Sequence, residues 1–80
     1  MAEYTPSRAA RRIRQLRKQR HLNQTQVAKV MNVAQRTYSD YERGRTKLNI
    51  VHLLTLAKFY DVSVDYICGV RNERLPFPRR

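Results

Sequence analysis

The feature that most constrains the fold lies between residues 23 and 44, where two short amphipathic segments are joined by a tight link. In each segment the apolar residues recur at helical spacing, so they share one face of a helix. They are Val27, Ala28 and Met31 in the first segment, and Tyr38 and Tyr41 in the second. Asn32, between the segments, tolerates the left-handed backbone of a sharp turn. The pattern predicts a helix-turn-helix, with the small Ala28 where the two helices approach most closely.

The polar residues of this stretch lie off the two apolar faces and give it a basic, amide-rich outer surface. They include Gln24, Gln35, Arg36, Ser39, Asp40 and Arg43. A compact helix-turn-helix with such a surface has the shape and the charge that fit the major groove of DNA. We therefore expect this surface to face a nucleic acid.

Composition narrows the choice of partner. The chain has 80 residues, enough for one small domain, and a formal net charge of +11 from 17 Lys and Arg against 6 Asp and Glu. Such an excess favours a polyanion, either a nucleic acid or an anionic membrane surface. The lone Cys68 excludes an internal disulfide and suits a reducing cytoplasm. No apolar run is long enough to cross a bilayer, and no signal peptide is visible.

Capping residues predict three further helices outside this stretch. The caps are Thr5, Asn49 and Ser63, and the helices are expected from Pro6 to about Gln19, from Ile50 to about Tyr60, and from Ser63 to Gly69. Residues 1–7 form an arm and the start of the first helix. The helix after Asn49 is expected to supply the largest share of the core, through Ile50, Leu53, Leu54, Ala57 and Tyr60, which follow a helical spacing.

The two helices of the central stretch differ in their caps. Asn23 is a good cap for the first, whereas Ala34, before the second, has no capping side chain. The second should span about residues 35–43 and stop at Gly44, whose freedom at positive φ suits the end of a helix.

Three spaced motifs together resemble the Cro and phage-repressor (XRE-type) helix-turn-helix family. They are IRQLRKQR, LNQTQVAKVMNVAQRTYSDYERG and VHLLTLAKFYDVSVDYICG, and the resemblance covers about residues 12–69. It implies an all-α, compact five-helix bundle with the helix-turn-helix at its second and third helices, and a DNA-binding domain over residues 8–69. It also implies a sequence-specific transcriptional regulator, most simply a repressor, of bacterial or phage type.

Four residues of the third helix are candidates for reading bases. Gln35 and Arg36 open this helix, and their side chains can make bidentate pairs with adenine and with guanine. Asp40 either accepts from a cytosine amino group or pairs with Arg36 or Arg43 one turn away, and the intrahelical pair is favoured. Ser39 could contact a base or a phosphate.

The resemblance places a second set of residues against DNA phosphates on either side of the groove. These residues are Asn23, Gln24, Arg43, Arg45, Thr46 and Lys47. Asn23 could act as a helix cap alone or contact a phosphate as well. The resemblance further pairs Arg17 with Glu42, which makes both residues structural, and puts Tyr41 in the core.

No catalytic or metal-binding set of residues is visible. His21 and His52 lie apart from any second ligand, so the sequence predicts no metal, no cofactor and no enzyme. One rival reading is an antitoxin or protein-interaction adaptor with the same fold, whose C-terminal tail recruits a protein partner. Another is adsorption to an anionic membrane through the first helix, but its apolar stripe is too thin for firm insertion.

A two-fold homodimer is expected on DNA, because one copy offers few base contacts. Its half-sites would be separated by roughly 34–36 Å, one turn of the duplex. The last helix and the segment from Leu75 to Phe77 supply the candidate interface. Pro76 and Pro78 exclude a helix there, so the 70–80 tail is expected to be extended or mobile.

Overall fold

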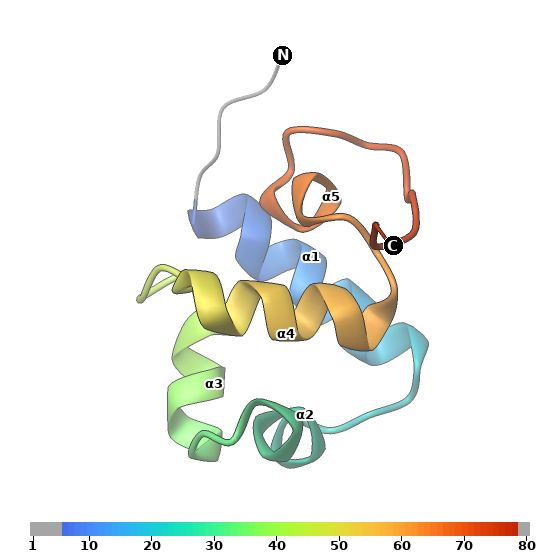
Figure 1. Ribbon diagram of the computed structural model, residues 1–80. Helices are drawn as coiled ribbons and strands as arrows, with labels where there is room; N and C mark the ends of the chain where they lie inside the picture. Colours follow the sequence, from blue (N-terminus) through green and yellow to red (C-terminus); the bar gives the residue numbers. More distant parts are fainter. Residues whose placement is uncertain (1–5, 79–80) are drawn as a thin grey trace.

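The structure, a computed structural model, describes residues 6–78 and contains five helices among them (Figure 1). They are α1 (Pro6–Gln19), α2 (Gln24–Met31), α3 (Gln35–Glu42), α4 (Ile50–Tyr60) and α5 (Val64–Cys68). The predicted all-α, five-helix architecture is confirmed. The expected Thr5 cap and the arm before it lie outside the described residues. None of these helices is both long and apolar enough to span a bilayer.

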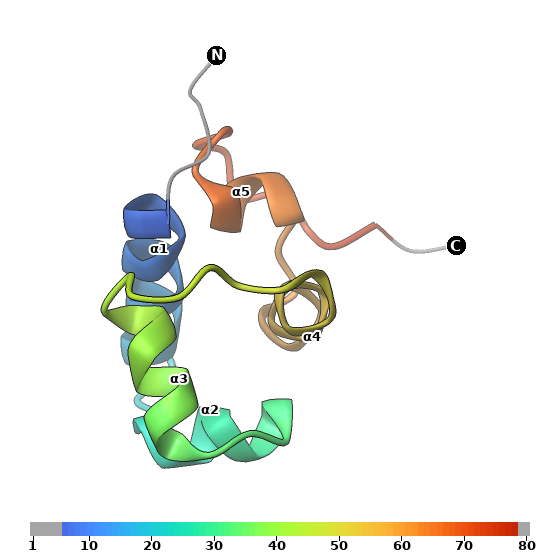
Figure 2. The ribbon, with the colours of Figure 1, turned by 90° about the vertical axis from the view of Figure 1, so that its left-hand side faces the viewer.

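Every helix turns its apolar face toward one shared core. Ile13, Val27, Tyr38, Leu56 and Ile67, one from each helix, are fully buried. Burial of a large apolar side chain contributes about 1.5–3 kcal/mol, so this core is the main source of stability. α1 packs against α3 and α5, while α2 packs against α3 and α4. Both views place α2 and α3 at one end of the molecule and α5 at the other (Figures 1 and 2).

The apolar face of α4 differs from the predicted one. Ile50 and Leu54 were expected in the core, but they are 63% and 37% exposed, whereas Leu56 is fully buried. Ile50 lies in the first turn, where the neighbouring helices leave it uncovered. Leu54 follows Leu53 by one residue, or about 100° of rotation, which carries it to the edge of the buried stripe.

Residues next to α2 and α3 determine where these two helices begin and end. Asn23 and Gln26 form a capping box, in which the Asn23 side chain accepts from the Gln26 N–H and the Gln26 side chain accepts from the Asn23 N–H, both at 2.8 Å. Asn32 takes up the left-handed backbone predicted for the link, with φ 58°. Ala34 makes no capping hydrogen bond. The start of α3 is therefore held by its neighbours rather than by a cap.

The segment after α5 is extended and packed against the domain. The Leu75 carbonyl accepts from the Ser63 N–H at 2.9 Å, and the Phe77 N–H donates to Asp61 at 3.3 Å. Phe77 is half-buried against the core, with the Lys58 ammonium 5.8 Å from its ring centre. The tail was expected to be either extended or mobile, and residues 70–78 are extended.

Candidate nucleic-acid interface

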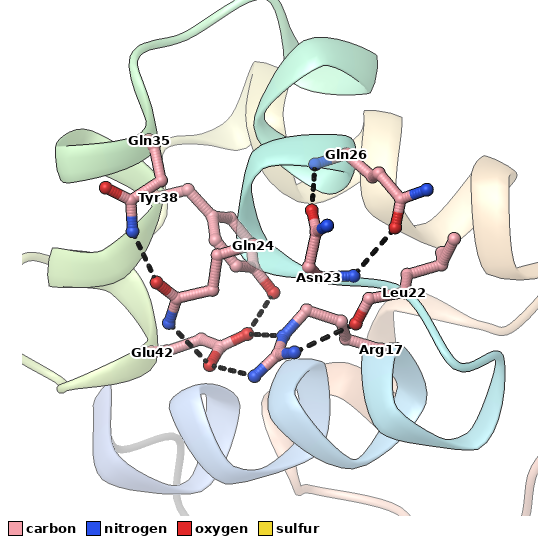
Figure 3. A network of polar contacts seen from close by, with 8 residues as sticks. All are labelled: Arg17, Leu22, Asn23, Gln24, Gln26, Gln35, Tyr38 and Glu42. Atoms are coloured by element: carbon pink, nitrogen blue, oxygen red, sulfur yellow. Dashed lines mark hydrogen bonds and ion pairs between the residues drawn. The ribbon is translucent and has the colours of Figure 1, made fainter.

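An ion pair fixes α3 to α1. Arg17 Nε lies 2.6 Å from Glu42 Oε2 and Arg17 Nη2 lies 3.0 Å from Glu42 Oε1, so the pair is bidentate (Figure 3). Arg17 Nη1 also donates to the Leu22 carbonyl at 2.9 Å, and the Tyr38 hydroxyl donates to Glu42. The structure thus contains the Arg17–Glu42 contact that the resemblance implied, and it adds the link between α1 and α2 to the same cluster.

The surroundings of Glu42 keep it ionised although its side chain is only 4% exposed. Burial alone would raise the pKa of Glu42, but hydrogen bonds from Arg17, Tyr38 and Gln24 outweigh burial and lower this pKa below its ordinary value. The hydrogen bond to Glu42 raises the pKa of Arg17, and burial raises the pKa of Tyr38. Near neutral pH the carboxylate, the guanidinium and the phenolic O–H therefore all keep the forms that this cluster needs.

Gln24 connects the buried ion pair to the outer surface of α3. Gln24 Nε2 donates to Glu42 Oε1 at 3.2 Å, and Gln24 Oε1 accepts from Gln35 Nε2 at 2.6 Å (Figure 3). Gln24 was expected to contact phosphate, but in this structure both ends of its amide are bonded within the protein. Gln35 keeps its carbonyl oxygen and its second amide N–H for an outside partner.

The outer side of α3 forms a hollow of about 520 Å³. Its lining consists of Gln35, Arg36, Ser39, Asp40, Arg43 and Arg45. The structure thus brings the four candidate base-reading residues together with two arginines of the candidate phosphate set. Ser39 departs from the expectation of an open outer position, because it is only 9% exposed and can lie only at the floor of the hollow.

The expected intrahelical ion pair of Asp40 is absent. No ion pair joins Asp40 to Arg36 or Arg43, both of which lie in the described part of the chain. An exposed pair at this spacing contributes only about 0.3–0.5 kcal/mol, which side-chain entropy readily offsets. The Asp40 carboxylate therefore remains available to an external donor inside a basic hollow.

The candidate phosphate-binding residues lie in two places. Asn23 is exposed at the start of α2, where its side-chain oxygen is already used by the capping box. The others, Gln24 excepted, are exposed in the link that follows α3, at Arg43, Arg45, Thr46 and Lys47.

Two contacts near the interface were not predicted from the sequence. Tyr38 was treated only as a core residue, and the structure buries it fully while its hydroxyl donates to Glu42. The i, i+4 spacing of Tyr38 and Glu42 is the signal that could have shown this contact. Tyr41 is buried as expected, and its hydroxyl lies 2.8 Å from Nδ1 of His52.

No metal-binding cluster occurs in the described residues. Three or more His, Cys, Asp or Glu side chains do not come together anywhere between residues 6 and 78. Cys68 is half-buried, and burial raises the pKa of its thiol. A protonated thiol of this kind is a weak nucleophile and a poor metal ligand.

The fold and this surface define a helix-turn-helix domain with a polar, basic outer face on its second helix. Comparison with protein families agrees, since the helix-turn-helix family HTH_3 matches residues 13–67. The chain therefore belongs to the XRE-type helix-turn-helix family of transcriptional regulators. Members of this family are not enzymes.

Two known protein sequences are similar to the chain. It is 42% identical over 65 residues to the uncharacterized HTH-type transcriptional regulator YobD of Bacillus subtilis (strain 168). This match covers 81% of the chain and 58% of YobD. It is 42% identical over 53 residues to the cryptic phage CTXphi transcriptional repressor RstR of Vibrio cholerae. That match covers 66% of the chain and 48% of RstR. The chain thus spans only about half the length of these relatives.

Two crystal structures share the fold. A transcriptional regulator from Listeria innocua superposes with a TM-score of 0.75 and 34% identity, covering 81% of this chain and 61% of that one. The P22 c2 repressor, in complex with synthetic operator 9T in the presence of Tl+, gives a TM-score of 0.73 and 32% identity, covering 79% and 96% of the two chains.

Proposed function

We propose that this chain is a sequence-specific, double-stranded DNA-binding repressor that inserts α3 into the major groove of an inverted-repeat operator. The observation that carries the proposal is Gln35, whose amide is held at the exposed start of α3 by the chain of contacts through Gln24 to Glu42. The likeness to the P22 c2 repressor, which was crystallised with a synthetic operator, supports the same assignment. Such a regulator acts where the DNA is, in the cytoplasm of a bacterial cell.

In this proposal the hollow on α3 reads bases. Gln35 pairs with an adenine and Arg36 with the O6 and N7 atoms of a guanine, each contact being worth about 1–3 kcal/mol of discrimination. Because Gln24 already fixes the Gln35 amide, less side-chain entropy is lost when the base pair is contacted. Asp40 accepts from a cytosine amino group, and Ser39 contacts the base or phosphate that reaches the floor of the hollow.

The exposed cationic link after α3 supplies affinity for DNA rather than sequence specificity. Arg43, Arg45, Thr46 and Lys47 contact the phosphates on one side of the groove, while Asn23 does so at the start of α2. Each cation that neutralises a phosphate releases counterions, which makes binding fall steeply as salt is added. Gln24 acts in this scheme by positioning Gln35.

Selection from random duplex DNA at roughly 150 mM salt tests the proposal. The expected result is an enriched inverted repeat in which single positions change when Gln35→Ala or Arg36→Ala is selected in parallel. Lys47→Gln is the matched control, because loss of a phosphate contact weakens binding to all sequences alike and leaves the enriched sequence unchanged. Failure to enrich any sequence would overturn the proposal.

We further propose that the chain binds its operator as a homodimer through α4. The sequence pointed to α5 and the segment around Phe77, but Phe77 packs into its own domain. Exposed large apolar residues gather instead on α4, where Ile50, Val51 and Leu54 are 63%, 66% and 37% exposed. A second copy of the chain would bury this surface and would present a second α3 to the other half-site.

A further inference from the structure

A second basic hollow lies between the N-terminal half of α1 and α5. Its volume is about 770 Å³, and its lining includes Arg8, Arg11, Arg12, Gln15, Tyr66 and Asn72. None of the described residues that line it is acidic. Figures 1 and 2 both place α5 at the end of the molecule far from α2, so this hollow is separate from the helix-turn-helix.

Three arginines concentrate positive charge on one wall. Arg8, Arg11 and Arg12 follow one another at i, i+3 and i+4, so their side chains leave the same side of α1. The sequence carries no acid between Glu3 and Asp40 that could balance them from within α1. Arg11 is exposed and makes no hydrogen bond or ion pair with a residue in the described range. An anion would relieve the repulsion between these side chains.

Arg12 is already held in place for an anion. Its Nη2 donates to Asn72 Oδ1 at 2.8 Å, and its guanidinium carbon lies 4.1 Å from the centre of the Tyr66 ring. Tyr66 is itself only 8% exposed, so the ring is a rigid support. A guanidinium fixed on both sides loses little rotamer freedom when a ligand binds to its remaining N–H groups.

Gly69 sets the shape of the other wall. It ends α5 with φ +79°, and a Cβ atom at this position would lie 2.9 Å from Cβ of Arg8. Only glycine allows the chain after α5 to approach α1 this closely in this conformation. The backbone at Gly69 thus packs directly against the Arg8 side chain at the edge of the hollow.

We propose that this hollow binds a small ligand with clustered phosphate groups, such as the polyphosphate part of a nucleotide. Guanidinium groups match phosphate oxygens in bidentate geometry, and the amides of Gln15 and Asn72 add donors beside them. The volume lies within the range of about 300–1,000 Å³ that small-molecule sites occupy. The site does not depend on base reading by α3.

Calorimetric titration of the full chain with tripolyphosphate at roughly 150 mM salt tests the proposal. We expect saturable binding of one ligand per chain, weakened about fivefold or more by Arg11→Gln. Arg14→Gln is the matched control, since it removes the same charge from an exposed position of α1 that does not line the hollow. Its dissociation constant should stay within about twofold of the unmodified chain.

A second variant tests the prearranged arginine. Asn72→Ala removes the hydrogen bond to Arg12 from an exposed position, so it should weaken tripolyphosphate binding without unfolding the chain. Absence of saturable binding would overturn the proposal. Equal weakening by Arg11→Gln and Arg14→Gln would do so too, because it would indicate only general attraction to a basic protein. Loss of duplex binding alone in Arg11→Gln, without tripolyphosphate uptake, would instead assign the hollow to the DNA interface.

Discussion

At the scale of single residues, the placement of the first three helices depends on one buried carboxylate that accepts several hydrogen bonds. Glu42 accepts from Arg17, Tyr38 and Gln24, and these residues come from three different helices. A buried carboxylate is costly unless its hydrogen bonds are satisfied, so the cluster enforces one relative placement of α1, α2 and α3. That placement in turn fixes where Gln35 emerges.

Glu42→Gln should lower the free energy of unfolding by about 3 kcal/mol at neutral pH, because Arg17 then remains buried without a balancing charge. The variant should also lose part of the acid dependence of stability. The pKa of Glu42 in the folded chain lies below its ordinary value of 4.5, so its ionisation stabilises the fold above that pH. This contribution disappears as the pH falls through the lower, folded pKa. Urea unfolding at neutral pH and at several acid pH values measures both effects.

Glu73→Gln is the control for that experiment. Glu73 is 74% exposed and lies 3.9 Å from Arg71, so its removal should change stability by less than about 0.5 kcal/mol. Equal effects of the two variants would contradict the structural role of Glu42.

The sequence predicted some of these residue contacts and missed others. The Arg17–Glu42 pair came from the resemblance, and the burial of Tyr41 from helical spacing. The bond from Gln24 to Gln35 and the absence of an Asp40 ion pair depend on side-chain rotamers, which spacing alone does not determine. This is why Gln24 was assigned to phosphate and Asp40 to an arginine.

At the scale of the elements, the sequence predicted where the helices begin better than it predicted which side of each helix is buried. Caps at Asn23, Asn49 and Ser63 all accept the predicted backbone hydrogen bonds. The exposed and buried sides of α4 were harder to predict, because apolar residues occur nearly all round this helix. Which of them is covered depends on helices distant in the sequence, and so the exposure of Ile50 and Leu54 was missed.

The uncapped start of α3 gives a prediction at this scale. Ala34→Ser should raise the free energy of unfolding by about 0.5–1 kcal/mol, because Ala34 already has the extended backbone of a cap, with φ −68° and ψ 150°. For a domain of this size that is a rise in Tm of roughly 2–8 °C by circular dichroism. Asn23→Ala, at the cap of α2, should lower stability by about 1 kcal/mol. An unchanged or lower Tm for Ala34→Ser would show that the start of α3 is satisfied in another way.

At the scale of the whole molecule, the five helices present two basic hollows and one exposed apolar surface. The excess of positive charge in the sequence predicted a polyanionic partner, but not that the arginines would divide between α3 and the α1–α5 hollow. That division arises from tertiary packing. It places the arginines of the α3 hollow at one end of the molecule, and it leaves the exposed apolar residues of α4 for the second copy that we propose.

Ile50→Asp should abolish self-association without unfolding the chain, since Ile50 is 63% exposed and leaves no cavity. Analytical ultracentrifugation of the chain, alone and with the selected duplex, measures the effect. Leu75→Asp serves as the control on the C-terminal segment, where Leu75 is 40% exposed. If only Leu75→Asp disrupts the dimer, the interface lies in the tail, as the sequence first suggested.

Base reading by α3 is tested most directly by a double-mutant cycle between protein and DNA. Arg36→Ala is combined with a duplex in which the guanine assigned to Arg36 is replaced by 7-deazaguanine, which lacks the N7 acceptor. Each change alone should weaken binding by about 1–3 kcal/mol, and the two together should cost little more than the larger single loss. Losses that simply add, or an affinity that neither change alters, would contradict the account.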